Sequence, residues 1–132
     1  MIKGLTIGHA AYQVSDMDKA LEFYCDVLGC EKAFDILRDG KPWIIYIKVC
    51  KGQFVELFYG LEKNSQETSY KHLCLTVDDI NDIPKTLEEH GYPMDSPPKQ
   101  GSDGNWQCWA SDPDGNRIEF MQIMPDSRQA KA

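Results

Sequence analysis

The sequence contains no run of lysine and arginine residues, and its formal net charge at pH 7 is −7. A protein that binds the phosphate backbone of nucleic acid needs clustered positive charge, so this composition argues against a nucleic-acid partner. The sequence also has no apolar stretch long enough to span a membrane, and its first residues have no long apolar core of the kind found in signal peptides. These absences predict a cytoplasmic protein with neither a nucleic-acid nor a membrane partner.

Paired cysteine motifs are missing as well. The five cysteines are odd in number, and none of them forms a CxxC motif. Free thiols in a reducing cytoplasm are the simplest interpretation. The chain has 132 residues, of which 42% are hydrophobic, so it is long enough and apolar enough to fold as one domain with a core.

What the sequence does contain is an internal repeat. His9 and Glu56 recur as His72 and Glu119, 63 residues further along in both cases. Other identical residues keep the same register without a gap: Val14/Val77, Asp16/Asp79, Trp43/Trp106 and Gly52/Gly115. Because an internal repeat determines the architecture, we expect two copies of one unit with the chemistry at equivalent places in each.

The first copy has the hydrophobic pattern of one helix and four strands in the order β-α-β-β-β. Ser15 is expected to cap the N-terminus of the helix, and Gly29 is expected to end it. The dipeptides Asp39-Gly40 and Lys51-Gly52 favour tight turns between the last three strands. The expected strands are 5–14, 30–38, 41–50 and 53–60.

The second copy follows the same order less clearly. A strand over 70–77 precedes a helix over 78–91, and a hairpin over 105–123 closes the copy. Prolines and glycines in 92–104 weaken the remaining strand. We predict an α+β fold of two tandem βαβββ modules in a single domain, residues 1–132. Its parts are module one 4–60, linker 61–69, module two 70–124 and a loose polar tail 125–132.

The repeated histidines and glutamates are candidate metal ligands. In each copy the histidine lies on the first strand and the glutamate on the last. Glu56 and Glu119 have apolar neighbours, where a carboxylate is costly unless it is paired or coordinates an ion. Two neutral imidazoles, two carboxylates and one divalent cation carry no net charge. This donor set predicts a site that keeps positions open to water and suits Ni²⁺, Co²⁺, Fe²⁺, Mn²⁺ or Zn²⁺.

An open metal site next to a carboxylate suits proton abstraction beside a carbonyl or hydroxyl through a metal-held enediolate. Glu119 and Glu56 are the candidate catalytic bases. Side chains two residues apart on a strand share a face, and this alternation predicts further substrate-pocket residues. They are Gln13, Phe54, Phe58, Cys74, Thr76 and Met121. The alternative interpretation, a solvent-facing strand histidine and glutamate, does not explain why the pair repeats.

Four segments carry a family resemblance: GHAAYQVSDMDKALEFYCDVLGC, VELFYG, KHLCLTVDD and WASDPDGNRIEFMQ. With these segments the chain resembles the vicinal oxygen chelate superfamily over residues 4–124. That superfamily includes glyoxalase I, bleomycin-resistance proteins and extradiol dioxygenases, and the His-Glu-His-Glu pattern is most similar to bacterial glyoxalase I (lactoylglutathione lyase). The resemblance implies that His9, Glu56, His72 and Glu119 bind Ni²⁺ or Co²⁺, sometimes Zn²⁺, with Glu119 as the leading base.

The resemblance also implies a reaction and a partner. The reaction is isomerisation of the hemithioacetal of a thiol and a 2-oxoaldehyde, as in methylglyoxal detoxification, and the protein is expected to be a homodimer. The family typically has an arginine four residues after the first histidine and an asparagine four residues after the first glutamate. Here Gln13 and Gly60 stand at those places, so we expect weak or altered use of glutathione.

Two alternatives remain within the superfamily. The first is a methylmalonyl-CoA epimerase-like enzyme or another metalloenzyme, although epimerases commonly have glutamine at the second ligand position, where this chain has Glu56. The second is a non-catalytic protein that binds a small molecule such as an antibiotic, in which the four ligand residues would be idle.

Overall fold

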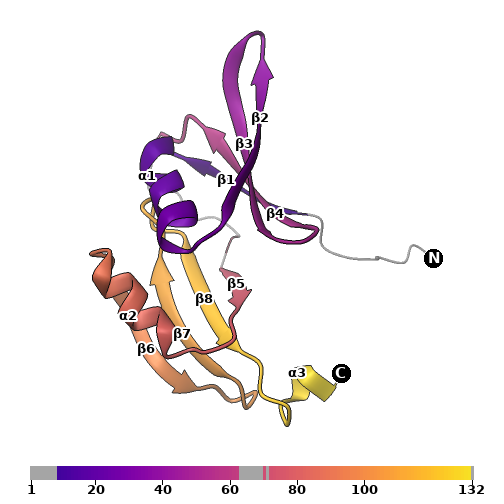
Figure 1. Cartoon of the computed structure of the whole chain (residues 1–132), viewed down its shortest axis with the longest axis vertical. Coiled ribbons are helices and arrows are strands. Elements are labelled where there is room, and N and C mark those ends of the chain that lie inside the picture. The colour runs from indigo at the N-terminus through magenta and orange to yellow at the C-terminus, as the bar shows by residue number, and fades with distance from the viewer. Residues whose placement is uncertain (1–8, 63–69, 71, 132) are drawn as a thin grey trace, which may run out of the picture. The chain divides into compact units, whose positions relative to one another are not determined.

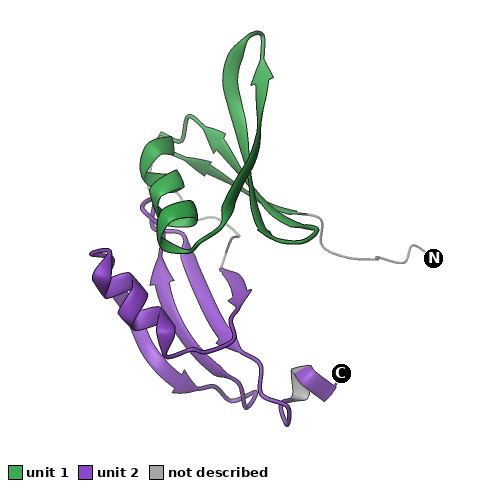
Figure 2. Cartoon of the chain, in the orientation of Figure 1, with its two compact units in different colours: residues 1–66 green, residues 67–132 purple. Residues whose placement is uncertain are grey.

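The computed structural model describes residues 9–62, 70 and 72–131. They belong to two compact units, one within residues 1–66 and the other within residues 67–132 (Figure 2). Each unit has one four-stranded sheet (Figure 1), so the predicted α+β fold of two βαβββ modules is confirmed. The expected strand residues 5–8 and residues 63–69 of the expected linker lie outside the described residues. In the described part of the chain, no helix has the length and apolar character needed to span a membrane.

The first unit has the element order expected from its sequence. Helix α1 (Met17–Leu21) continues without a break into a π-helical segment, η1 (Glu22–Val27). The sheet has the strand order β1-β4-β3-β2, in which β1 runs parallel to β4 and the other neighbours are antiparallel. The strands are β1 (His9–Val14), β2 (Glu31–Arg38), β3 (Lys41–Cys50) and β4 (Gln53–Tyr59).

The N-terminus of α1 is capped by Asp16, not by Ser15 as the sequence had suggested. The Asp16 carboxylate accepts a hydrogen bond from the backbone N–H of Lys19 at 3.1 Å. An N-cap side chain must reach an N–H two or three residues into the helix, and Asp16 directly precedes the first helical residue. The expected end is confirmed, because the helical segment stops at Val27 and Gly29 adopts a φ of 74°.

Alternation along the strands separates the core of the first unit from its functional face. Val55 and Leu57 are 1% and 0% exposed, and Glu56 between them points to the other side of β4. Tyr46 is the direct partner of Glu56 on β3 and therefore shares its face. The buried hydrophobic residues of this unit are Tyr12, Val14, Met17, Ala20, Phe23, Tyr24, Val27, Ile44, Ile45, Ile47, Val55 and Leu57.

The second unit repeats this arrangement with the strand order β5-β8-β7-β6. Its first strand is shorter than expected and begins at Leu73 rather than at residue 70. Its elements are β5 (Leu73–Thr76), α2 (Asp82–Glu89), β6 (Met94–Gln100), β7 (Trp106–Ser111), β8 (Arg117–Gln122) and a short helix, α3 (Arg128–Lys131).

Strand β6 forms despite two consecutive prolines, Pro97 and Pro98. It is the edge strand of its sheet, and its register with β7 shifts between Met94 and Ser96 and again between Ser96 and Lys99. Proline lacks the N–H that a central strand would have to donate, but an edge strand with irregular pairing tolerates this loss. The weak strand expected from the sequence is therefore present, and it lies at the edge of the sheet, where the missing N–H groups of proline destabilise the pairing least.

The hairpin between β7 and β8 is held by Asp112, the first residue of the DPDGN segment. Its carboxylate accepts hydrogen bonds from the backbone N–H groups of Asp114 and Asn116, both at 2.9 Å, and from the Asn116 side chain. Gly115 completes the turn with a φ of 83°. This turn fixes the start of β8 and so the register in which Glu119 is presented.

The tail is more ordered than the sequence suggested. Helix α3 occupies Arg128–Lys131, within the segment 125–132 that was expected to be loose. Ser127 is 3% exposed, and its hydroxyl accepts a hydrogen bond from the backbone N–H of Ala130 at 3.1 Å. A buried serine that caps the first turn supplies the order that the polar composition did not reveal.

The strand registers of the two units differ by the same 63 residues as the sequence repeat. Ala11 and Tyr46 are the partners of Glu56 on its two neighbouring strands. Cys74 and Trp109 are the partners of Glu119 in the same way. The repeat is therefore a repeat of backbone pairing, and each unit presents its glutamate from the same place in its sheet.

Candidate functional site

The first unit brings His9 and Glu56 together. The Nε2 atom of His9 lies 3.3 Å from a carboxylate oxygen of Glu56. His9 begins β1, Glu56 lies in the middle of β4, and the parallel pairing of these strands sets their separation. Glu56 is 8% exposed, whereas the His9 side chain is 46% exposed. The pair therefore has a buried acidic side and an open imidazole side.

The second unit forms the same pair from His72 and Glu119. Here the Nε2 atom lies 3.2 Å from the carboxylate oxygen. Glu119 is 6% exposed, and the His72 side chain is 40% exposed. The two units thus match in the separation, burial and chain position of the pair. Within each unit, the described residues include no group of three or more histidine, cysteine, aspartate or glutamate side chains suited to a metal ion.

Aromatic side chains surround the pair of the first unit. The Tyr46 hydroxyl donates a hydrogen bond to the Glu56 carboxylate, and this bond, together with partial burial, raises the pKa of Tyr46. The Tyr46 ring stacks on Phe34 at a centroid distance of 4.4 Å and meets the His9 ring edge-on at 6.0 Å. Tyr46, which contacts both members of the pair, was not predicted from the repeat, because the equivalent residue of the second copy is Trp109.

The surroundings of the second pair are different. The His72 ring meets Trp109 edge-on at 4.9 Å, and the Arg117 guanidinium lies 4.6 Å from the centre of the Trp109 ring. The Cys74 thiol donates a hydrogen bond to Glu119. Cys74 is an exposed residue, and partial desolvation of its thiol together with the Glu119 charge raises the pKa of Cys74 to about 12. The thiol is therefore protonated at neutral pH and acts as a donor.

The expected pocket residues are divided between the two pairs. Phe54 and Phe58 flank Glu56 on its own face of β4, and both are half-buried. In the second unit Thr76 pairs with Met121, and each lies two residues further along its strand than Cys74 and Glu119, on the same face of the sheet. Met121 is 7% exposed, and its sulfur accepts a hydrogen bond from the Asn105 side chain at 3.4 Å. The candidates thus gather as two sets, one in each unit.

Gln13 lies at the end of β1 beside Gly60. Its side-chain amide donates to the backbone carbonyl of Tyr59 at 3.3 Å. A Cβ atom at Gly60 would lie 3.7 Å from the same amide nitrogen. Gly60 has a φ of 94°, a conformation in which side chains other than those of asparagine and aspartate are strongly disfavoured. The two departures noted in the sequence are therefore neighbours in the folded unit.

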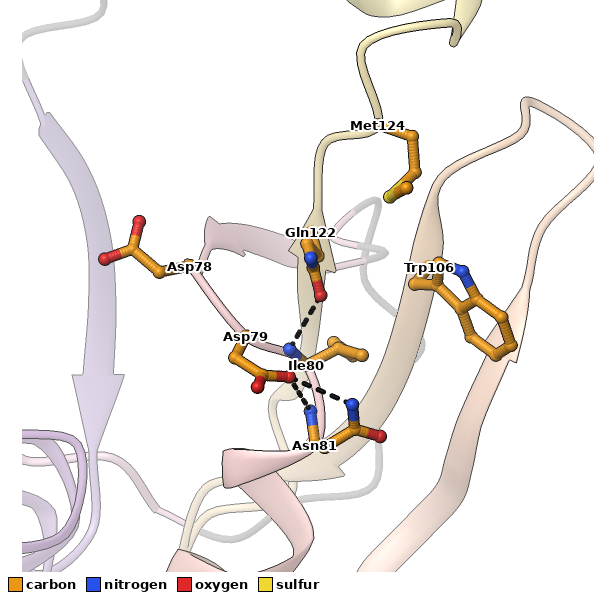
Figure 3. Close-up of a pocket in the computed structure, with 7 residues that line it drawn as sticks. All are labelled: Asp78, Asp79, Ile80, Asn81, Trp106, Gln122 and Met124. Atoms are coloured by element: carbon orange, nitrogen blue, oxygen red, sulfur yellow. Dashed lines mark hydrogen bonds between the residues drawn. The ribbon is translucent and has the colours of Figure 1, made fainter.

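A separate cavity of about 440 Å³ lies in the second unit, between the loop before α2 and the ends of β7 and β8 (Figure 3). Gln122 lies three residues from Glu119 on β8, so their side chains leave the sheet on opposite faces. The cavity therefore does not contain the His72–Glu119 pair. It is lined by Asp78, Asp79, Ile80, Asn81, Trp106, Gln122 and Met124.

Internal hydrogen bonds already use several polar groups of this cavity wall. The Gln122 side chain accepts from the backbone N–H of Ile80 at 3.0 Å, and Asp79 accepts from the backbone and side chain of Asn81 at 2.9 and 3.0 Å (Figure 3). These bonds shape the turn that leads into α2. Trp106, a member of the sequence repeat, is 38% exposed and lines this cavity. It pairs with Gln122 and therefore lies on the opposite face of the sheet from Glu119.

Comparison with known proteins relates these features to a family. The sequence profile of the Glyoxalase/Bleomycin resistance protein/Dioxygenase superfamily matches residues 6–120. A protein described as lactoylglutathione lyase from Haemophilus influenzae is 30% identical over 131 residues, which cover 89% of this chain and 93% of the relative.

Solved structures agree with this match. A member of the same superfamily from Sphaerobacter thermophilus has a TM-score of 0.71 and 31% identity, covering 90% of this chain and 98% of that one. An antibiotic binding protein from a Streptomyces species has a TM-score of 0.77 and 23% identity, covering 94% of this chain and 100% of that one. At that identity the second likeness shows the fold alone.

Proposed function

The chain belongs to the glyoxalase/bleomycin resistance protein/dioxygenase superfamily, and we propose that it is a metal-dependent lyase of the glyoxalase I type. The observation that carries this proposal is the twofold occurrence of a His–Glu pair with a buried carboxylate at equivalent strand positions. Relatives described as lactoylglutathione lyases support it. The proposed substrate is the hemithioacetal of a 2-oxoaldehyde and a thiol, and the product is the thioester of a 2-hydroxy acid.

Two imidazole nitrogens and two carboxylate groups form a donor set that suits one divalent metal ion. A carboxylate that is less than a tenth exposed needs a positive partner, and the ion pairs found for both glutamates in the described residues are with histidine. His9, Glu56, His72 and Glu119 would together hold the ion, with Ni²⁺ or Co²⁺ favoured and Zn²⁺, Mn²⁺ or Fe²⁺ possible. When bound, the ion would act as a Lewis acid toward the substrate oxygens.

The carboxylates supply the proton transfer. In the hemithioacetal, C1 carries a hydrogen, a hydroxyl and the sulfur, and C2 is a ketone. Glu119 removes the C1 proton to give an enediolate and returns it to C2, while the C1 hydroxyl proton passes to the C2 oxygen. The thioester product therefore contains the same atoms as the substrate, and no oxidant is consumed. A carboxylate next to the reacting carbon is suited to this task as a general base and then a general acid.

The thiol is proposed to be something other than glutathione. The resemblance places the contacts to a charged thiol at the positions of Gln13 and Gly60, which are neighbours in this chain. A neutral amide beside a glycine offers no cation for a carboxylate, and it loses the bidentate pairing that a guanidinium provides. A thiol without a negative charge at this end fits the two residues better.

The protein is further proposed to act as a homodimer in the cytoplasm. Strand β2 is an edge strand whose residues are all at least partly exposed, including Phe34 at 49% and Leu37 at 59%. Large apolar side chains exposed on an edge strand form a surface that natural proteins usually cover. The five free cysteines fit a reducing compartment.

His72→Ala should strip the metal. The variant removes one of two imidazole donors and leaves Glu119 without its histidine partner. After reconstitution with Ni²⁺ or Co²⁺, mass spectrometry of the metal content should give about one ion per site for the parent protein and a small fraction of that for the variant. His90→Ala is the matched control, because His90 is an exposed helix-end residue bonded to the Thr86 carbonyl. Full metal content in His72→Ala would contradict the ligand assignment.

Glu119→Gln should lower turnover by several orders of magnitude while preserving the fold. Glutamine keeps an oxygen donor but cannot accept the C1 proton, so kcat should fall by about 10²–10⁴-fold. Thioester formation from methylglyoxal and a panel of thiols measures the effect, and Glu89→Gln, an exposed helix position, is the control. A parent protein that binds a small molecule but turns over no thiol adduct would support the antibiotic-binding alternative. Activity on an acyl-CoA would support the epimerase-like alternative.

Gln13→Arg should shift thiol preference toward glutathione. The new guanidinium would pair with a thiol carboxylate that Gln13 cannot neutralise. The ratio of kcat/KM for the glutathione adduct to that for the 2-mercaptoethanol adduct should rise, and Gln13→Met, of similar length but uncharged, should not raise it. If the parent protein already uses the glutathione adduct with a kcat/KM of roughly 10⁴–10⁸ M⁻¹s⁻¹, the proposed thiol preference is wrong.

Light scattering coupled to size-exclusion chromatography should give twice the mass of the 15.0 kDa chain. Leu37→Lys places a charge on the exposed edge strand β2, and it should weaken the dimer if this surface is covered by the partner. Glu62→Lys, outside the sheet, is the matched control. A parent protein that stays monomeric at micromolar concentration would disprove the dimer.

A further inference from the structure

We propose that Tyr46 is a positioning residue for Glu56 and that the duplicated site is chemically unequal, since a phenol hydroxyl holds Glu56 whereas a thiol faces Glu119. The inference rests on the proposed function, because it assigns roles within the same site.

Tyr46 contacts both members of the first pair. Tyr46 and Glu56 are direct partners on antiparallel strands β3 and β4, so their side chains leave the sheet on the same face. The phenol donates to the Glu56 carboxylate while its ring meets His9 edge-on. The ring is itself held by stacking on Phe34. Stacking on Phe34 therefore restrains the Tyr46 ring, and the hydrogen bond from Tyr46 restricts rotation of the Glu56 side chain.

In the described part of the second unit, the position equivalent to Tyr46 carries no phenol. Trp109 stands 63 residues after Tyr46 and pairs with Glu119 in the same register, but an indole carries no hydroxyl. Its ring packs against His72 and Arg117. The donor to Glu119 comes instead from the neighbouring strand, as the thiol of Cys74. In the first unit, the residue equivalent to Cys74 is Ala11, whose side chain has no hydrogen-bond donor.

A phenol and a thiol restrain a carboxylate to different degrees. An O–H bond to an ionised carboxylate is short and strong, whereas an S–H group is a weak donor. Hydrogen bonds from neighbouring side chains orient metal ligands and tune their affinity. Glu56, held by Tyr46, is therefore the better-anchored ligand. Glu119, held by a thiol, has more freedom to reorient between two substrate carbons.

The test is a Co²⁺ titration of the metal-free full-length protein, followed by the visible absorption of the bound ion and by calorimetry. Tyr46→Phe keeps the ring and removes only the hydroxyl, so Co²⁺ affinity should fall by about 10–100-fold and the absorption bands should change shape. Tyr59→Phe, at an exposed tyrosine on the same sheet, should change neither. Thermal melting of the metal-free variants verifies that each is folded.

Two further variants complete the test. Tyr46→Trp gives the first unit the residue found in the second, and it should show the same loss of affinity even if Tyr46→Phe folds poorly. Cys74→Ala removes the weaker donor and should lower affinity by much less than Tyr46→Phe. Equal losses in Cys74→Ala and Tyr46→Phe would overturn the inequality of the two pairs.

The outcomes separate the inference from the function on which it rests. If the parent protein binds no Co²⁺, no Ni²⁺ and no Zn²⁺, the proposed metal-dependent function fails. If the parent binds Co²⁺ and folded Tyr46→Phe and Tyr46→Trp bind it equally well with unchanged spectra, the function stands and the role of Tyr46 is disproved.

Discussion

The structure depends on the burial of two carboxylates, each beside an imidazole from a parallel neighbouring strand. Glu56 and Glu119 are 8% and 6% exposed, and both lie among strands whose other faces form the cores. An ionised carboxylate is unfavourable in such a place unless positive charge or hydrogen bonds offset the loss of water. His9 and His72 supply a partial offset at 3.3 and 3.2 Å. The proposed divalent cation would complete it, and this need for positive charge supports the proposed metal-dependent function.

Much of this arrangement follows from the sequence because it depends on periodicity. The 63-residue offset predicts equal strand registers, and the registers around Glu56 and Glu119 are equal. The turn residues also act locally, so Gly52 and Gly115 adopt positive φ in both units, as their place in the repeat requires. The order of helix and strands in each unit is confirmed for the same reason.

Features that depend on neighbouring strands or on one residue of register were not predictable in this way. Cys74 was predicted to line the pocket, but its contact with Glu119 depends on which strands pair, as does the contact of Tyr46 with Glu56. Neither residue recurs at the equivalent position of the other copy. Comparison of positions 46 and 109 would have revealed two aromatic residues in register, of which only Tyr46 has a hydroxyl, but not that this hydroxyl donates to Glu56. The cap of α1 moved by one residue to Asp16, and β6 formed because its prolines lie at an edge.

Strand β8 also separates two environments. Glu119 and Met121 lie on the face of the sheet that carries the His72–Glu119 pair. Ile118, Phe120 and Gln122 lie on the opposite face, toward the core and the cavity. Insertion or deletion of a single residue within this strand would exchange the two sets, exposing phenylalanine to water and sending the carboxylate into the core. An insertion or deletion is therefore expected to be tolerated in the turns and loops that flank β8 rather than within the strand.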